Sequence, residues 1–208
     1  MSKLFSPDSK FYRVMSAVGD LIILNFIFMI SCLPVLTVGA AAVALYRGVL
    51  AIRRDEGSSP ARVYWDTFRR EWKQATVLWL LLLLCAVVPA AAVFWYYRHG
   101  SPSVPILALA ILTVFFYFSV LSYAFPLQAQ FRNTTLRIIK NAVILTWAYP
   151  LRSLAMVAIN ILPAVNLALF PYWFLRLGFF WFSLGFALLC YGDTGILRPV
   201  FSKLSRPK

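Results

Sequence analysis

The sequence predicts an all-α protein, a polytopic membrane bundle of about five spanning helices. The first observation is the segment Thr76–Tyr97, which has 22 residues and no charged side chain. As a helix it would be about 33 Å long, enough to cross a hydrocarbon core of about 30 Å. The second observation is composition: 62% of residues are hydrophobic, 13% are charged, and the mean hydropathy is +0.77. Soluble domains carry more charge, so we expect a single membrane domain over residues 1–208.

The first apolar segment, residues 18–52, is interrupted by the sequence PVLTVG between Pro34 and Gly39. Its length is too great for one straight span and too small for two complete spans. Proline removes a backbone donor and bends or ends a helix. We therefore predict one span that is broken near Pro34–Gly39.

Residues 61–74 follow a polar loop and have an amphipathic pattern. Aromatic side chains fall within one arc of about 100°, with arginine and lysine opposite. This pattern is typical of a helix that lies in the membrane surface, and also of a helix that caps the bundle. We predict an interfacial helix with three aromatic side chains turned inward: Trp65, Phe68 and Trp72.

Three further apolar segments are predicted to span the membrane: Val104–Leu127, Leu151–Phe170 and Leu175–Tyr191. The connector at residues 128–150 has charge at its front and apolar residues at its end. We interpret it as an interfacial helix or a helical extension toward the core.

Lysine and arginine are unevenly distributed among the connecting segments. Residues 47–74 carry seven of them, residues 128–152 and the tail carry four each, and the two other loops carry one each. Cytoplasmic loops are enriched in these residues, so we expect residues 47–74 and the C-terminus to be cytoplasmic in a bacterial plasma membrane. Five spans then place the N-terminus outside. If the first segment instead re-enters, both termini are cytoplasmic.

The sequence shows no catalytic motif, so we expect no enzymatic activity, no cofactor and no metal site. The carboxylates Asp20 and Asp193 are interpreted as lying at span ends, and the three cysteines as small buried hydrophobic residues. The basic pI of about 10.1 is explained by membrane orientation, so no nucleic-acid partner is expected. A set of polar residues could line a solute path or join helices by hydrogen bonds: Asn25, Thr37, Asn141, Asn160 and Asn166.

Three segments together resemble the YesL-like family of bacterial membrane proteins. They are SCLPVLTVGAAAVALYRG (31–48), FRREWKQAT (68–76) and SYAFPLQAQFRNTTLRIIKNAVILT (122–146), in the family's order and spacing. The matching positions are Pro34, Thr37, Gly39, Ala41, Tyr46, Phe68, Lys73, Gln74, Phe125, Pro126, Lys140 and Asn141. The resemblance implies structural or partner-contact roles for them, because none is an obvious catalyst.

The family has no established molecular activity. Its members are often encoded beside carbohydrate-uptake ABC transporters, which implies an accessory subunit that contacts an ABC permease or a second copy of itself. The alternative is a stand-alone transporter or channel for a small solute. A third interpretation, an enzyme acting on a lipid-linked sugar, has no visible acid–base pair to support it.

Overall fold

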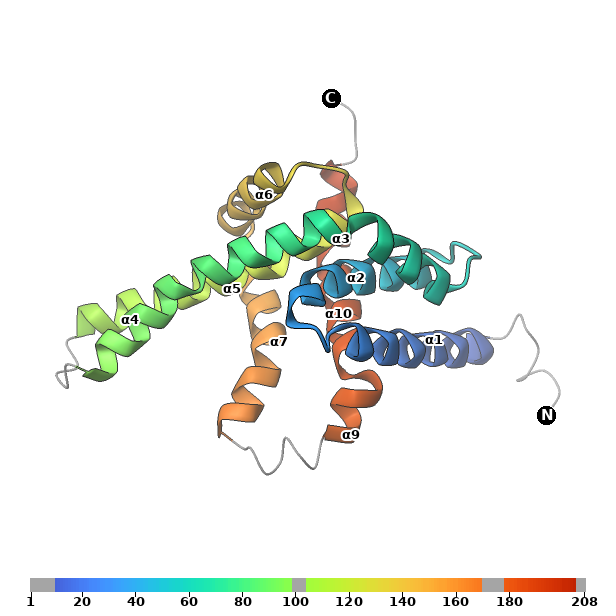
Figure 1. Cartoon of the computed structure of the whole chain (residues 1–208), viewed down its shortest axis with the longest axis horizontal. Helices are drawn as coiled ribbons and strands as arrows, with labels where there is room; N and C mark the ends of the chain where they lie inside the picture. The colour runs from blue at the N-terminus through green and yellow to red at the C-terminus, as the bar shows by residue number, and fades with distance from the viewer. Residues whose placement is uncertain (1–9, 99–103, 170–177, 205–208) are drawn as a thin grey trace.

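A computed structural model describes residues 10–98, 104–169 and 178–204 (Figure 1). Every element in these ranges is a helix, which confirms the all-α class. In chain order they are α1 (Lys10–Ser31), η1 (Val35–Thr37), α2 (Val38–Arg54), α3 (Pro60–Cys85), α4 (Val87–Arg98), α5 (Val104–Gln130), α6 (Thr135–Ala148), α7 (Pro150–Leu169), α9 (Gly178–Phe180), the π-helical turn η2 (Trp181–Gly185) and α10 (Phe186–Leu204).

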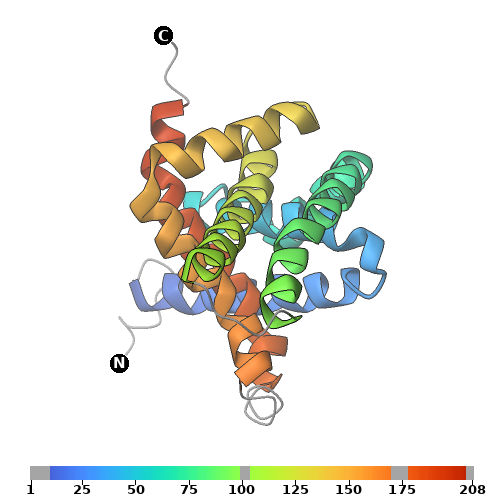
Figure 2. The ribbon, with the colours of Figure 1, turned by 90° about the vertical axis from the view of Figure 1, so that its left-hand side faces the viewer.

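Five helical segments among the described residues are long and apolar enough to cross a membrane. They are Phe11–Ser31, Val35–Arg54, Pro60–Tyr96, Val104–Gln130 and Gly178–Lys203. The chain is therefore a multi-pass membrane protein. The predicted span at Leu151–Phe170 corresponds to α7, which meets the length and hydropathy required of a span only together with α6. The two helices meet at a bend of 110° (Figure 2).

The predicted break near Pro34–Gly39 is confirmed, but it separates two helices rather than two halves of one span. The helix α1 begins at Lys10, inside the polar lead, so both α1 and α2 reach spanning length. The apolar segment predicted from the sequence began at residue 18, so it left out the first eight residues of α1. The Thr37 hydroxyl donates to the carbonyls of Ser31, at 2.6 Å, and Pro34, at 2.7 Å, which satisfies backbone groups freed at the reversal.

The helices α1 and α2 form an antiparallel hairpin. Arg13 near the start of α1 pairs with Asp55, just after the end of α2, at 2.7 Å. The start of α1 and the loop after α2 are therefore on the same side of the bundle. The bundle geometry therefore favours the alternative in which the N-terminal side and residues 47–74 share a side, although α1 and α2 are two full helices and no re-entrant segment. Which side is cytoplasmic stays a prediction.

The helix α2 is the centre of the bundle. It packs against α1, α3, α5 and α10. Of the residues in its most apolar stretch, 61% are buried inside the protein, whereas the share is 17% for the span formed by α3 and α4 and 17% for α5. Small residues allow this close contact on several sides. A Cβ atom on Gly39 would lie 2.5 Å from the carbonyl oxygen of Ala75 and 2.6 Å from Cβ of Trp79, so only glycine fits there.

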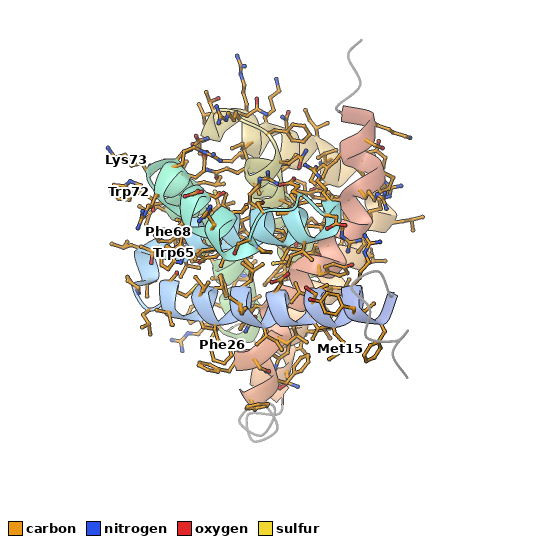
Figure 3. All side chains as sticks on the ribbon, turned by 90° about the vertical axis from the view of Figure 1, so that its right-hand side faces the viewer. Met15, Phe26, Trp65, Phe68, Trp72 and Lys73 are labelled. Carbon is orange, nitrogen blue, oxygen red and sulfur yellow. The ribbon has the colours of Figure 1, made fainter. Side chains whose placement is uncertain are left out.

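The amphipathic segment 61–74 is helical, as predicted, but it is the first part of α3 and continues directly into a span. Two of its tryptophans point away from the bundle: Trp65 is 42% exposed and Trp72 is 49% exposed (Figure 3). The prediction that they face inward was wrong. The buried stripe of α3 is formed by other residues: Tyr64, Thr67, Ala75, Leu78 and Leu82.

We expect Gly39→Ala to lower the free energy of unfolding by about 1–3 kcal/mol, because the added methyl group must force α2 away from α3. The matched control is Gly19→Ala in α1, where no atom lies within 4 Å of the added Cβ. The control should be neutral or slightly stabilising. Unfolding in mixed micelles, followed by far-UV circular dichroism, measures both. Equal stability of the two variants would contradict the close α2–α3 contact.

Candidate functional site

The strongest candidate site is a buried carboxyl group, that of Asp193 in α10. Its side chain is fully enclosed, with 0% exposure. The interpretation that it lies at a span end was wrong, because α10 does not stop at Tyr191 but continues to Leu204. Leu197, Val200 and Phe201 repeat the apolar spacing of a helix, a signal that the glycines and proline of this segment concealed.

Three helices meet at this carboxyl group, because α10 packs on both α2 and α7 (Figure 1). The Tyr46 hydroxyl from α2 donates to Asp193 Oδ2 at 2.6 Å, and Asn160 Nδ2 from α7 donates to the same oxygen at 2.9 Å. Asn160 Nδ2 also contacts the carbonyl oxygen of Met156 at 3.0 Å and Ser122 Oγ on α5 at 3.4 Å. The cluster thus links α2, α5, α7 and α10.

No described cationic side chain forms an ion pair with Asp193, and its Oδ1 atom has no hydrogen-bond partner there. Arg53 reaches the same part of α10 but is used elsewhere. Its Nη2 donates to the Tyr191 carbonyl at 2.5 Å, and its Nε donates to Thr194 Oγ1 at 3.2 Å. A buried carboxyl group without a counter-ion inside a membrane bundle is a functional candidate, since it is costly to retain.

A second polar contact stabilises the π-helical turn η2. Such a turn leaves backbone groups without their usual helical partners. Asn25 from α1 donates to the carbonyls of Trp181, at 3.0 Å, and Phe182, at 2.6 Å, and accepts from the Ala187 amide at 2.9 Å. Asn25 and Asn160 therefore act by joining helices, one of the two roles expected for the polar set.

The remaining members of the polar set have other surroundings. Thr37 closes the α1–α2 reversal, as described above. Asn141 on α6 lines a hollow of about 210 Å³ together with Asn133. Asn166 lies near the end of α7, and its Oδ1 has no partner among the described residues.

Trp79, just after the second of the three quoted segments, contacts the other two segments, and no sequence motif indicated it. Its indole nitrogen donates to the Val35 carbonyl at 3.1 Å, and its ring packs on Phe125 at 6.3 Å between centroids. Gln74 Nε2 donates to the Asn133 carbonyl at 2.5 Å. The three segments are thus brought together by packing and backbone contacts.

The other candidate positions divide into buried and exposed groups. Ala41 and Pro126 are buried, with Pro126 inside α5, and Phe68 is half-buried. Pro34 is exposed at the reversal, and Lys73 and Lys140 are exposed on α3 and α6. The structure therefore does not unite Gln74, Lys140 and Asn141 in one contact: only Gln74 and Asn141 approach the same residue, Asn133.

The cysteines do not share one environment. Cys190 is buried, Cys32 is half-buried and Cys85 is exposed, so the prediction that all three are buried was wrong for Cys85. In the described part of the chain no group of three or more His, Cys, Asp or Glu side chains could hold a metal ion. His99 lies outside the described residues.

We expect a measurable coupling between Tyr46 and Asp193. In a double-mutant cycle of Tyr46→Phe and Asp193→Ala, which removes the acceptor, the interaction energy should be about 0.6 kcal/mol and at most about 1.7 kcal/mol, the average and the maximum found for hydrogen bonds between membrane helices. Unfolding in mixed micelles measures the four proteins of the cycle. The control pair is Tyr46→Phe with Thr113→Val on α5, whose hydroxyl bonds only its own helix. Additive effects for Tyr46 and Asp193 would contradict the contact.

Comparison with known proteins relates part of the chain to a family. Residues 21–92 match the model of a family described as "Protein of unknown function, DUF624". No curated protein and no solved structure matches the chain. The matched residues, from α1 to α4, contain the first two of the three quoted segments. This part of the chain is therefore similar to DUF624, the family of YesL-like bacterial membrane proteins that the quoted motifs resemble.

Proposed function

We propose that this protein is an accessory or structural membrane subunit that acts by protein–protein association and carries out no catalysis. The partner implied by the family resemblance is the permease of a carbohydrate ABC uptake system. A second copy of the chain is the other partner that the resemblance allows.

The observation that carries this proposal is an apolar groove between α4, α5 and α7. It has a volume of about 360 Å³, and its lining includes Leu107 and Ile111 from α5, Val93 from α4 and Val157 from α7. The helices α4 and α5 lie side by side and extend away from the rest of the bundle (Figure 1). A helix of a partner protein could lie along this groove.

Small residues next to the groove favour a protein helix as its occupant. Ala110 of α5 is part of the groove lining, and Ala90, three residues before the groove residue Val93 on α4, is exposed. Small residues at a membrane helix surface let a second helix approach closely and pack by van der Waals contact. Lipid chains need no such close approach, so this surface supports association.

The charge distribution supports a bacterial plasma-membrane orientation with residues 47–74 and the C-terminus on the cytoplasmic side. On that side we propose the α6 surface around Lys140 and Asn141 as a second contact. A hollow of about 210 Å³ lies beside this surface, and its lining includes Asn133 and Asn141. A partner side chain could enter it.

One observation favours the alternative, a transporter for a small solute. Asp193 is a buried carboxyl group with an unused oxygen, and intramembrane carboxylates often mark proton or ion pathways. Solute or proton flux in liposomes that is lost in Asp193→Asn would support transport. Flux by the purified protein alone would also contradict a purely accessory role.

We expect a photo-crosslinking amino acid at Leu107, in the groove, to form a covalent adduct with an ABC permease polypeptide in cells. The matched control is Ile30 on α1, which is 62% exposed and lies outside the groove. Immunoblotting against the permease, with mass spectrometry of the adduct, measures the outcome. Equal crosslinking at both positions, or adducts with lipid only at both, would contradict the groove as a partner site.

We expect Lys140→Glu to reduce the amount of permease recovered with the protein in mild detergent about fivefold or more. Reversing one interfacial charge removes an attraction and adds a repulsion. Membrane insertion should be unchanged, because Lys140 is exposed on α6. Arg62→Glu, the same charge change at an exposed position of α3, is the control. If both variants lose the partner to the same extent, the effect is general electrostatics and the α6 surface is not a contact.

A further inference from the structure

Arginine side chains gather where α2 and α5 end and α10 passes. They line two neighbouring hollows, of about 420 Å³ and about 240 Å³, which share Arg54 and Gln130. We call this cluster the arginine face. Its members are Arg47, Arg53, Arg54, Arg70, Arg132 and Arg198.

Part of this cluster has a structural explanation. The last carbonyl groups of a helix carry partial negative charge and attract cations. Arg54 Nη2 donates to the side chain of Gln130, the last residue of α5, at 2.6 Å. Arg53 and Arg54 lie in the last turn of α2, so the helix end accounts for two arginines and leaves four to be explained.

Acidic side chains neutralise only a minority of the face. Glu56 pairs with Arg47 at 2.9 Å and with Arg54 at 3.7 Å, and Glu71 pairs with Arg70 at 2.9 Å. The hydrogen bond from Arg47 lowers the pKa of the Glu56 carboxyl group, so Glu56 stays charged at neutral pH. Six arginines and two glutamates leave an excess of four positive charges.

The larger hollow has the chemistry of an anion site. Three arginines line it (Arg53, Arg54 and Arg198), and its lining holds no acidic residue. Arg53 is fixed there by its bonds to α10 and lies over the Tyr191 ring at 3.9 Å. No described group accepts a hydrogen bond from the exposed Arg198. Guanidinium groups match the oxygen geometry of phosphate.

The other lining residues indicate how such an anion would be presented. Leu50 and Phe201 add an apolar wall, while the hydroxyl groups of Ser202 and Thr194, which also line the hollow, donate to carbonyl groups of their own helix. The hollow lies at the ends of two membrane spans, α2 and α5, where lipid headgroups are found. Basic pockets between membrane helices bind anionic headgroups in this way.

We propose that the larger hollow of the arginine face binds the phosphate group of an anionic membrane phospholipid. This proposal is independent of the proposed accessory function, because it concerns a different surface and a different ligand. Leu50 and Phe201 contact the glycerol and upper acyl region, and the three arginines contact the phosphate.

The test is the thermal stability of the purified protein in micelles with added phosphatidylglycerol, compared with phosphatidylcholine. A ligand that binds only the folded protein raises the melting temperature, and the rise grows with the logarithm of the ligand concentration divided by Kd. The wild type should be stabilised by phosphatidylglycerol only. Arg54→Gln with Arg198→Gln should weaken binding about 5- to 30-fold, from the known contribution of each arginine near an anionic surface. Arg53 is left intact because it also fixes α10.

The matched control is Arg62→Gln with Arg69→Gln, which removes the same charge from exposed positions of α3 outside both hollows. It should bind as the wild type does. Glu56→Gln should bind more tightly, since it releases Arg47 and Arg54 from a competing carboxylate. Melting temperatures in phosphatidylcholine verify that each variant is folded.

Three outcomes would overturn the proposal. Equal stabilisation of the wild type by both lipids would show no anion selectivity. An equal loss of phosphatidylglycerol binding in the α3 control variant would show that binding depends only on the net charge of the protein. Full protection by millimolar inorganic phosphate, equal to that by phosphatidylglycerol, would make a soluble phosphate the ligand instead of the lipid. Selective, variant-sensitive stabilisation by phosphatidylglycerol supports the proposal.

Discussion

The close contact between α2 and α3 at Gly39 is the constraint on which the rest of the arrangement depends. The backbone of Ala75 lies where a side chain at position 39 would be, so α2 can sit inside the bundle rather than at its edge. From this central position α2 contacts four neighbouring helices. In a bilayer, where lipid replaces water, such packing is the main force that joins helices.

Successive turns of α2 connect this packing to the two polar regions of the molecule. Gly39 sets the distance to α3, and Tyr46 reaches the buried carboxyl group of Asp193. Arg53 and Arg54, at the end of the helix, belong to the arginine face. A shift of α2 by even a fraction of a turn would change all three contacts, because they are on one rigid element. This links a structural glycine to the polar chemistry of the protein.

Much of the fold could be predicted from the sequence because lipid leaves few choices for long apolar segments. The helical class, the break near Pro34 and the helical segment 61–74 follow from charge, proline and periodicity. The directions of Trp65 and Trp72 could not be predicted, since an aromatic arc suits contact with lipid as well as contact with the bundle. Asp193 was misplaced because Gly192 and Gly195 look like a loop, whereas the structure continues α10 through both.

The placement of polar groups separates structural from functional roles. Asn25 uses both ends of its amide on the turn that precedes α10, so nothing remains for a ligand. At Asp193, two donors share Oδ2 while Oδ1 has no described partner. A group kept only to join helices would be expected to use its full hydrogen-bonding capacity, because an unpaired buried acceptor costs about 1–3 kcal/mol. The unused oxygen is therefore the feature of the interior that packing alone does not explain, and it is the reason why transport remains the alternative to association.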